Sequence, residues 1–99
     1  MTNVSDMVEI AKREYGVPEH CAYSLCNYFW GDNRPLGGFI TAVLENDLCK
    51  ASLKADDTNY KRLRNYARFI YNVAPDNAWG SPEKVKAWLE RGGDESQAT

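Results

Sequence analysis

The stretch "DDTNYKRLRNYARFIYNVAP", residues 56–75, decides the fold. Its apolar residues recur three and four positions apart, which is the spacing of one face of a helix. The inner face of this helix comprises Tyr60, Leu63, Ala67, Ile70 and Ala74, and it is widened by Tyr66, Phe69, Tyr71 and Val73. Asp56, Asp57 and Thr58 are each competent to cap its start, and Pro75 follows its end. So broad an apolar face predicts a central helix that other elements cover well.

Four further stretches show the helical period, and they span residues 5–15, 18–30, 37–53 and 82–91. The third contains Asn46 and Asp47, whose side chains compete for backbone hydrogen bonds. Either the helix bends or breaks there, or a partner such as an arginine holds Asp47, and a binding role for the two residues is the alternative. Trp88 fits a core position, and Trp79 is expected to fix the preceding turn onto the core. No stretch alternates apolar and polar residues for long, which argues against strands. The predicted fold is all-α, a single small bundle of about five short helices.

The length of 99 residues fits one domain, predicted over residues 1–93, with a disordered tail at 94–99. The net charge is −2 and the pI is about 5.3, so the overall field does not favour nucleic acid or an anionic membrane. No apolar run approaches the roughly 20 residues that span a bilayer. The first ten residues lack the apolar block of a signal peptide. We therefore expect a cytoplasmic protein without a membrane partner.

The residues with catalytic or metal-binding potential do not form a recognisable motif. Cys21, Cys26 and Cys49 are odd in number and widely spaced, which predicts buried, reduced cysteines rather than disulfides. His20, the only histidine, lacks the cysteine spacing of a structural zinc site and is expected at the surface.

The acids Glu45, Asp47, Asp56 and Asp57 are suited either to helix capping or to acid–base and metal chemistry, and capping is the commoner case. A small enzyme built on Cys21, His20 and these acids is one hypothesis. We expect a protein that is not an enzyme and that holds no metal or cofactor.

Gly37 and Gly38 precede an apolar helical run, as glycines do in phosphate-binding loops. The lysine of a Walker-type loop is missing, and no strand precedes the pair. The alternative is a turn in which Pro35 fixes one dihedral and a glycine adopts positive φ. This structural interpretation is the one we expect to hold.

Five residues are candidates for contact with a partner. Lys61, Arg64 and Arg68 are three and four apart and share one helix face, which suits an acidic protein or nucleic acid. The adjacent acids and the negative net charge favour a merely solvated face. Trp30 borders the loop that holds Arg34, and an exposed tryptophan beside an arginine is a plausible interaction anchor.

The segments "PLGGFITAVLENDL", "ADDTN", "FIYNVAP" and "WGSPEKVKAWL" together resemble a group of short, mostly uncharacterised proteins of bacteriophages and prophage-bearing bacteria. The resemblance covers about residues 18–89, and its pattern is GGFxTAVLxNDL followed by WGSPEKVxAWL. It implies a standalone, cytoplasmic, phage-derived domain and carries no catalytic motif.

Small acidic phage proteins commonly bind a host protein and block or redirect it, including proteins of host defence. The expected function is therefore a non-enzymatic module that binds a host protein, as a monomer or a homodimer. The alternative is a small nucleic-acid-binding regulator that uses the basic face of the helix at 56–75.

Overall fold

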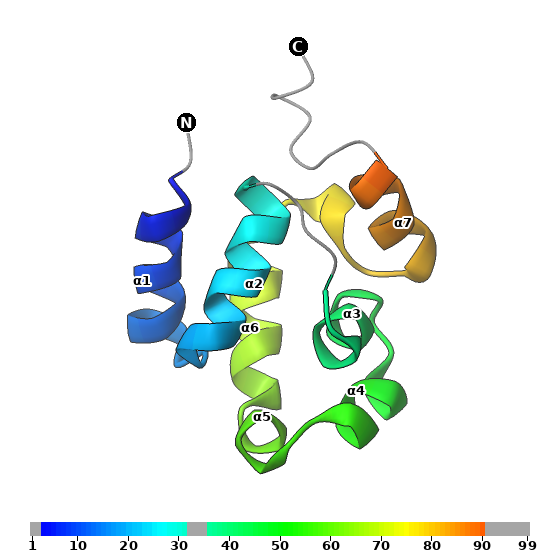
Figure 1. Ribbon diagram of the computed structural model, residues 1–99, viewed down its shortest axis with the longest axis horizontal. Coiled ribbons are helices and arrows are strands. Elements are labelled where there is room, and N and C mark those ends of the chain that lie inside the picture. The colour runs from blue at the N-terminus through cyan, green and yellow to red at the C-terminus, as the bar shows by residue number, and fades with distance from the viewer. Residues whose placement is uncertain (1–2, 32–35, 91–99) are drawn as a thin grey trace.

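The computed structural model describes residues 3–31 and 36–90, and within them it is helical, without strands. The elements in chain order are α1 (Val4–Tyr15), α2 (Glu19–Trp30), α3 (Gly38–Leu44), α4 (Leu48–Lys54), α5 (Asp57–Lys61), α6 (Leu63–Val73), the 3₁₀ helix η1 (Asp76–Ala78) and α7 (Pro82–Glu90) (Figure 1). The all-α prediction is confirmed. The expected number of about five helices is wrong, because two predicted helices are each divided. The tail predicted at 94–99 lies outside the described residues.

The first division separates α3 from α4 at Asn46 and Asp47, where the sequence predicted a bend or break. Asn46 adopts the left-handed conformation, with φ of 63°. Its N–H donates to the carbonyl of Val43 at 3.1 Å, and the Asp47 N–H donates to that of Ala42 at 2.9 Å, which is the bond pattern of a Schellman motif. Asp47 then caps α4 by accepting a 3.0 Å bond from the Lys50 N–H. Two residues thus end one helix and start the next in another direction.

The second division was not predicted. Arg62, with φ of −106° and ψ of 10°, separates α5 from α6, and its N–H bonds the carbonyl of Asn59 three residues back. The Asn59 side chain accepts a 2.6 Å bond from the Tyr66 hydroxyl, which ties α5 to the next helix. The single helix expected over 56–75 is therefore bent, and α5 lies across the lower end of α6 in Figure 1.

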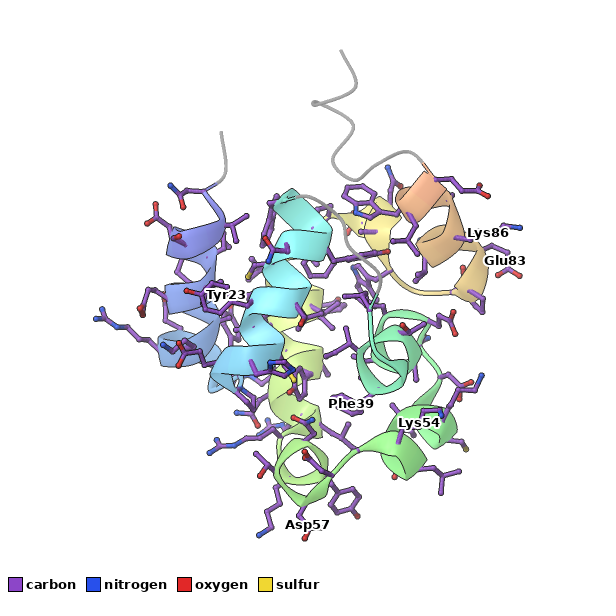
Figure 2. The ribbon with its side chains drawn as sticks, in the orientation of Figure 1. Tyr23, Phe39, Lys54, Asp57, Glu83 and Lys86 are labelled. Carbon is purple, nitrogen blue, oxygen red and sulfur yellow. The ribbon has the colours of Figure 1, made fainter. Side chains whose placement is uncertain are left out.

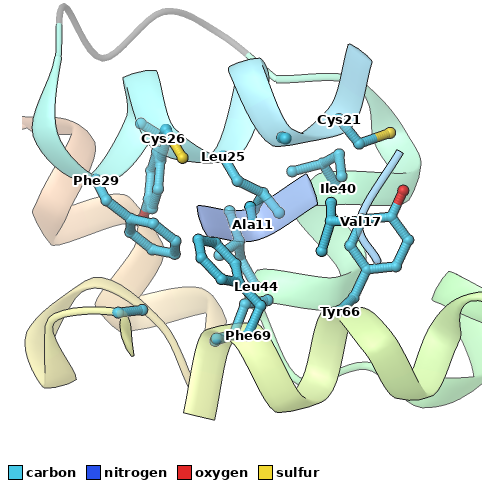
Figure 3. Close-up of a cluster of buried hydrophobic side chains, with 14 of the residues drawn as sticks. Ala11, Val17, Cys21, Leu25, Cys26, Phe29, Ile40, Leu44, Tyr66 and Phe69 are labelled. Atoms are coloured by element: carbon cyan, nitrogen blue, oxygen red, sulfur yellow. The ribbon is translucent and has the colours of Figure 1, made fainter. Parts of the chain in front are cut away.

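The core lies mainly between α2 and α6, with α1 and α3 at its sides (Figure 3). The largest fully buried side chains are Tyr28, Tyr66, Phe29, Phe69, Leu25, Leu44 and Cys26. Aromatic rings meet edge to face, as Phe39 and Tyr66 do at a centroid distance of 5.3 Å. Burying each large side chain contributes about 1.5–3 kcal/mol, so this layer provides most of the hydrophobic stabilisation.

Tyr28 joins α7 and η1 to the core. Its hydroxyl donates to the carbonyl of Ala78 at 2.7 Å, and its own carbonyl accepts from Trp88 Nε1 at 2.8 Å. Trp88 is buried, as predicted. Glu83 and Lys86 project outward from α7 in Figure 2, whereas Phe39 lies on the inner side of α3. The C-terminal helix is thus fixed by polar bonds as well as by apolar packing.

The two glycines before α3 do not use positive φ. Gly37 is the N-cap with φ of −70°, an extended conformation open to any residue, and Gly38 is the first residue of α3. In the described part of the chain the left-handed positions are Gly16, Gly80 and Asn46. The expectation of a positive-φ glycine at 37 or 38 is therefore wrong. The chain enters α3 from extended backbone, which needs no such residue.

None of the helices in the described ranges has the length and apolar character to cross a bilayer.

Candidate functional site: an apolar cavity beside α6

One side of α6 is not covered by the rest of the described chain. On this side Tyr71 is 77% exposed, and Ala67 is also exposed. The helix instead buries its other side, through Tyr66 and Phe69. The prediction of a well-covered central helix is therefore wrong for this side. The division of the helix at Arg62 and the turn at Asn46 place α4 and α5 so that this face stays open.

The open side of α6 forms one wall of a cavity of about 220 Å³. The opposite wall comes from the corner between α3 and α4, namely Val43, Asn46, Asp47, Leu48 and Ala51. The helix break described above creates this corner, because it points Leu48 outward and Ala51 inward. Leu48 is 74% exposed and stands at the rim, whereas Ala51 is buried in the wall.

The α6 wall consists of Leu63, Ala67, Ile70 and Tyr71, and Trp79 completes the lining. Trp79 is held there because the N–H of the next residue, Gly80, donates to the carbonyl of Leu44 at 2.8 Å. This bond fixes the turn before α7 onto the end of α3, as expected for Trp79. The indole N–H of Trp79 is buried and has no acceptor among the described residues.

Asp47 gives the cavity its only formally charged side chain. Asp47 Oδ1 accepts the capping bond from Lys50, and no lysine or arginine of the described ranges pairs with the carboxylate at ion-pair distance. Asn46 is exposed at the rim, and its side-chain amide makes no hydrogen bond within the described residues. The site is therefore an apolar hollow whose rim carries one negative charge and one free amide.

The predicted basic residues lie on two helices rather than on one face of a single helix. Lys61 ends α5, whereas Arg64 and Arg68 lie one turn apart on α6, and all three are exposed. None of them forms an ion pair within the described residues, and the Arg68 guanidinium lies 5.7 Å from the centre of the Tyr15 ring. Helical spacing puts Arg64 one turn from Ala67, a residue of the cavity wall.

Arg34, which was expected beside Trp30, lies outside the described residues. Trp30 is half-buried at the end of α2. Its ring meets that of Phe29 edge to face at 5.4 Å. Trp30 therefore packs partly onto the core instead of standing free.

The cysteines and His20 are distributed over different environments. Cys26 is fully buried, and this burial raises the pKa of its thiol to about 12. Cys21 is also buried, with Sγ 3.7 Å from Asn59 Oδ1, whereas His20 and Cys49 are exposed. The prediction of buried cysteines is thus right for two and wrong for Cys49, and the surface position expected for His20 is confirmed.

Two of the four acids act as helix caps, which is the predicted role. Asp47 caps α4, and Asp56 caps α5 by accepting a 2.8 Å bond from the Asn59 N–H. Across residues 3–31 and 36–90, no three histidine, cysteine or acidic side chains are grouped closely enough to hold a metal ion. Asp57 stands in the first turn of α5, whereas Glu45 is the C-cap residue of α3.

The sequence did not predict the cavity, although most of its lining residues were assigned to the apolar helix face, to the expected break or to the turn at Trp79, and two signals for it are present. The apolar face of residues 60–74 is broader than a chain of this size covers, and Leu48 directly follows the expected break. The cavity also brings together two segments that are far apart in the sequence, "NDL" at 46–48 and the tryptophan of "WGS" at 79.

A comparison of the chain with protein-family models, curated proteins and solved structures finds no match.

Proposed function

We propose that the chain is a non-enzymatic protein-binding module that acts in the cytoplasm of a host bacterial cell. It binds a host protein, such as a component of a defence system, and inhibits or redirects that protein by covering part of its surface. The observation that carries this proposal is the cavity beside α6 with its uncovered apolar rim.

The energetics of the rim support association with another protein. Leu48 and Tyr71 both keep most of their surface in water in the free chain. Burying a side chain of this kind contributes about 1.5–3 kcal/mol. Aromatic residues at the centre of a desolvated patch are typical interface hot spots. The walls are helices anchored in the core, so little ordering is needed when a partner binds.

The exposed basic residues indicate that the surface of the partner is acidic around the contact. Arg64 lies one helical turn from the wall residue Ala67, and Lys61 and Arg68 add exposed positive charge on α5 and α6. Charges at such a rim chiefly raise the rate of encounter. Trp30 and Arg34 remain candidate contacts outside the cavity.

A nucleic-acid-binding regulator is the second candidate. It is favoured by one observation, that Lys61, Arg64 and Arg68 are exposed and form no ion pair within the described ranges. Binding of this kind would weaken steeply with salt, because each phosphate contact releases counterions.

Affinity capture from a lysate of the bacterial host, with and without nuclease, tests the proposal. The baits are the tagged chain and two variants that each add a benzyl group to a helix surface. Ala67→Phe fills the cavity, whereas Ala87→Phe adds the same bulk to the exposed side of α7.

We expect one stoichiometric protein that survives nuclease, is retained by Ala87→Phe and is lost by Ala67→Phe. Capture that disappears with nuclease would favour the regulator. Equal capture of the protein by both variants would show that the cavity is not part of the contact surface.

A further inference from the structure

We propose that the cavity beside α6 binds a peptide segment of the partner that carries one large apolar side chain close to a lysine or arginine. This inference rests on the proposed function and specifies the chemistry of the partner. It follows from the size of the cavity, from the charge and amide at its rim, and from the position of the exposed leucines.

The size of the cavity fits a single anchoring side chain. An apolar cavity of about 150 Å³ accommodates a benzene ring. At about 220 Å³, the cavity here holds one leucine, methionine or phenylalanine side chain. Its walls are apolar on both sides, from Val43 and Ala51 to Ala67 and Ile70, so the group that enters must be apolar. A helix or strand backbone is too wide, and the rest of the segment therefore lies across the rim.

The charge at the rim of the cavity indicates which residue lies next to the anchoring side chain in the bound peptide. The Asp47 carboxylate has no cationic partner at ion-pair distance among the described residues. Beside apolar walls the effective dielectric constant is lower than in water, which strengthens its attraction for a cation. A lysine or arginine next to the anchor supplies that cation.

Asn46 favours a peptide over a small apolar molecule. Its amide is exposed at the rim, is free within the described residues, and offers both a donor and an acceptor. A peptide unit presents the complementary acceptor and donor. The left-handed backbone at Asn46 is fixed by the Schellman bonds, which hold the residue at this position.

A second copy of the chain would not close into a dimer by inserting its most exposed large apolar side chain. Among the described residues that side chain belongs to Leu53, which is 85% exposed and stands beside Lys54. However, Leu53 follows the wall residue Ala51 by two positions, which places it about 200° further around α4. A copy that inserted Leu53 would leave its own cavity facing away, so the contact would build open chains rather than a closed dimer.

Selection from a displayed library of random twelve-residue peptides tests the inference, with the full chain as bait. Enriched peptides are synthesised, and their affinities for the wild type, Ala67→Phe and Ala87→Phe are measured by fluorescence anisotropy. Two charge variants complete the set. Asp47→Asn removes the charge and keeps a competent N-cap. Glu45→Gln removes a neighbouring charge outside the cavity lining.

We expect enriched peptides with a lysine or arginine within four positions of a large apolar residue. Ala67→Phe should weaken their binding at least tenfold, a factor that corresponds to about 1.4 kcal/mol. Asp47→Asn should weaken it about threefold to tenfold, since a charge pair at a partly exposed rim is lost. Ala87→Phe and Glu45→Gln should bind as the wild type does.

The inference would be overturned by enriched peptides that lack basic residues and bind Asp47→Asn as tightly as the wild type. If these peptides still bind Ala67→Phe more weakly, the proposed binding surface would stand. Peptides that bind Ala67→Phe normally would overturn the proposed surface as well. A dimer of the wild type that sedimentation shows to dissociate in Ala67→Phe would identify a second copy as the occupant and overturn the inference.

Discussion

Gly16 and Gly37 show how differently a glycine can contribute at a helix end. Gly16 ends α1 with φ of 67°, and a Cβ there would lie 2.7 Å from Nδ2 of Asn65. That amide nitrogen donates a 2.8 Å bond to the carbonyl of Tyr15, which links α6 to α1. Gly37 has an ordinary φ, and a Cβ there would meet no atom within 4 Å. The first position requires glycine and the second does not.

Gly16→Ala is expected to lower the free energy of unfolding by about 1–2 kcal/mol, since an L-residue is strained in the left-handed region. Gly37→Ala should change it by less than about 0.5 kcal/mol, because the restricted unfolded chain is offset by the poorer N-cap that alanine makes. Urea titration followed by circular dichroism measures both. A larger loss in Gly37→Ala than in Gly16→Ala would contradict the assigned backbone conformations.

Two tryptophans differ in whether the indole N–H is satisfied. Nε1 of Trp88 donates to the Tyr28 carbonyl at 2.8 Å, whereas Nε1 of Trp79 is buried without an acceptor among the described residues. An unsatisfied buried donor costs about 1–3 kcal/mol.

Trp88→Phe should therefore destabilise the chain more than Trp79→Phe, by about 1 kcal/mol or more. The Trp79 substitution removes an unsatisfied group together with its packing, so its two effects oppose each other. Thermal unfolding of the two variants side by side provides the measurement. Equal losses, or a greater loss in Trp79→Phe, would show that the Trp79 N–H has a partner.

Helix α5 depends on one polar side chain for its position. It has five residues and none of them is buried. Asn59 Oδ1 accepts the 2.6 Å bond from the Tyr66 hydroxyl, and Cys21 Sγ lies 3.7 Å from the same oxygen. Most helices of this chain are held by apolar packing, whereas α5 is held by this small hydrogen-bonded cluster.

Asn59→Ala should cost about 1–3 kcal/mol, because it leaves the part-buried Tyr66 hydroxyl without its acceptor. It should also speed amide hydrogen exchange in residues 57–62 more than elsewhere. Asn72→Ala is the matched control, since the Asn72 amide makes only an exposed bond to the Arg68 carbonyl. Exchange in α5 that stays unchanged in Asn59→Ala would mean that other contacts hold this helix.

The sequence predicts the helices better than it predicts their divisions. The break at Asn46 is visible because asparagine and aspartate interrupt an apolar run there. The break at Arg62 has no such local signal. It accompanies the side-chain bond between Asn59 and Tyr66 and the packing of Tyr66 into the core, and such tertiary contacts cannot be read from helical spacing.

At the scale of the whole molecule, three buried ionisable groups link stability to alkaline pH. Burial raises the pKa of Cys26 to about 12, and it also raises the pKa of Tyr28 and of Tyr66. The folded state thus holds these protons more tightly than the unfolded chain does. Stability from this source is complete below the unfolded cysteine pKa of 9.0 and declines as the pH rises above it.

The free energy of unfolding should accordingly fall between about pH 8 and about pH 10.5. Cys26→Ala should show a smaller fall over the same interval, because one of the three groups is gone. The two buried tyrosines remain and still contribute to the fall. Urea titrations at the two pH values measure the difference. An identical fall in the variant and the wild type would contradict a neutral, buried Cys26.

The candidate site was not predicted from the sequence, because it is formed by several elements whose relative positions depend on the whole fold. The spacing of Leu63, Ala67 and Ile70 correctly indicates an apolar face. Whether another element covers that face depends on where α4 lies. The position of α4 depends on the turn at Asn46 between α3 and α4, and on the hydrogen bond from the Gly80 N–H to the Leu44 carbonyl at the end of α3. Exposed charges such as Lys61, Arg64 and Arg68 are easy to identify in a sequence, whereas an uncovered hollow is not.

Methyl NMR of the full chain, with and without the partner captured from the lysate, tests the central claim most directly. We predict that the largest shifts fall on Val43, Leu48, Ala51, Ala67 and Ile70, which line the cavity from both walls. Methyl groups of α1, such as those of Val4 and Ile10, should stay in place and serve as the internal control. Shifts concentrated on α1 or α7, with the cavity methyl groups unmoved, would contradict the assignment of this cavity as the binding surface.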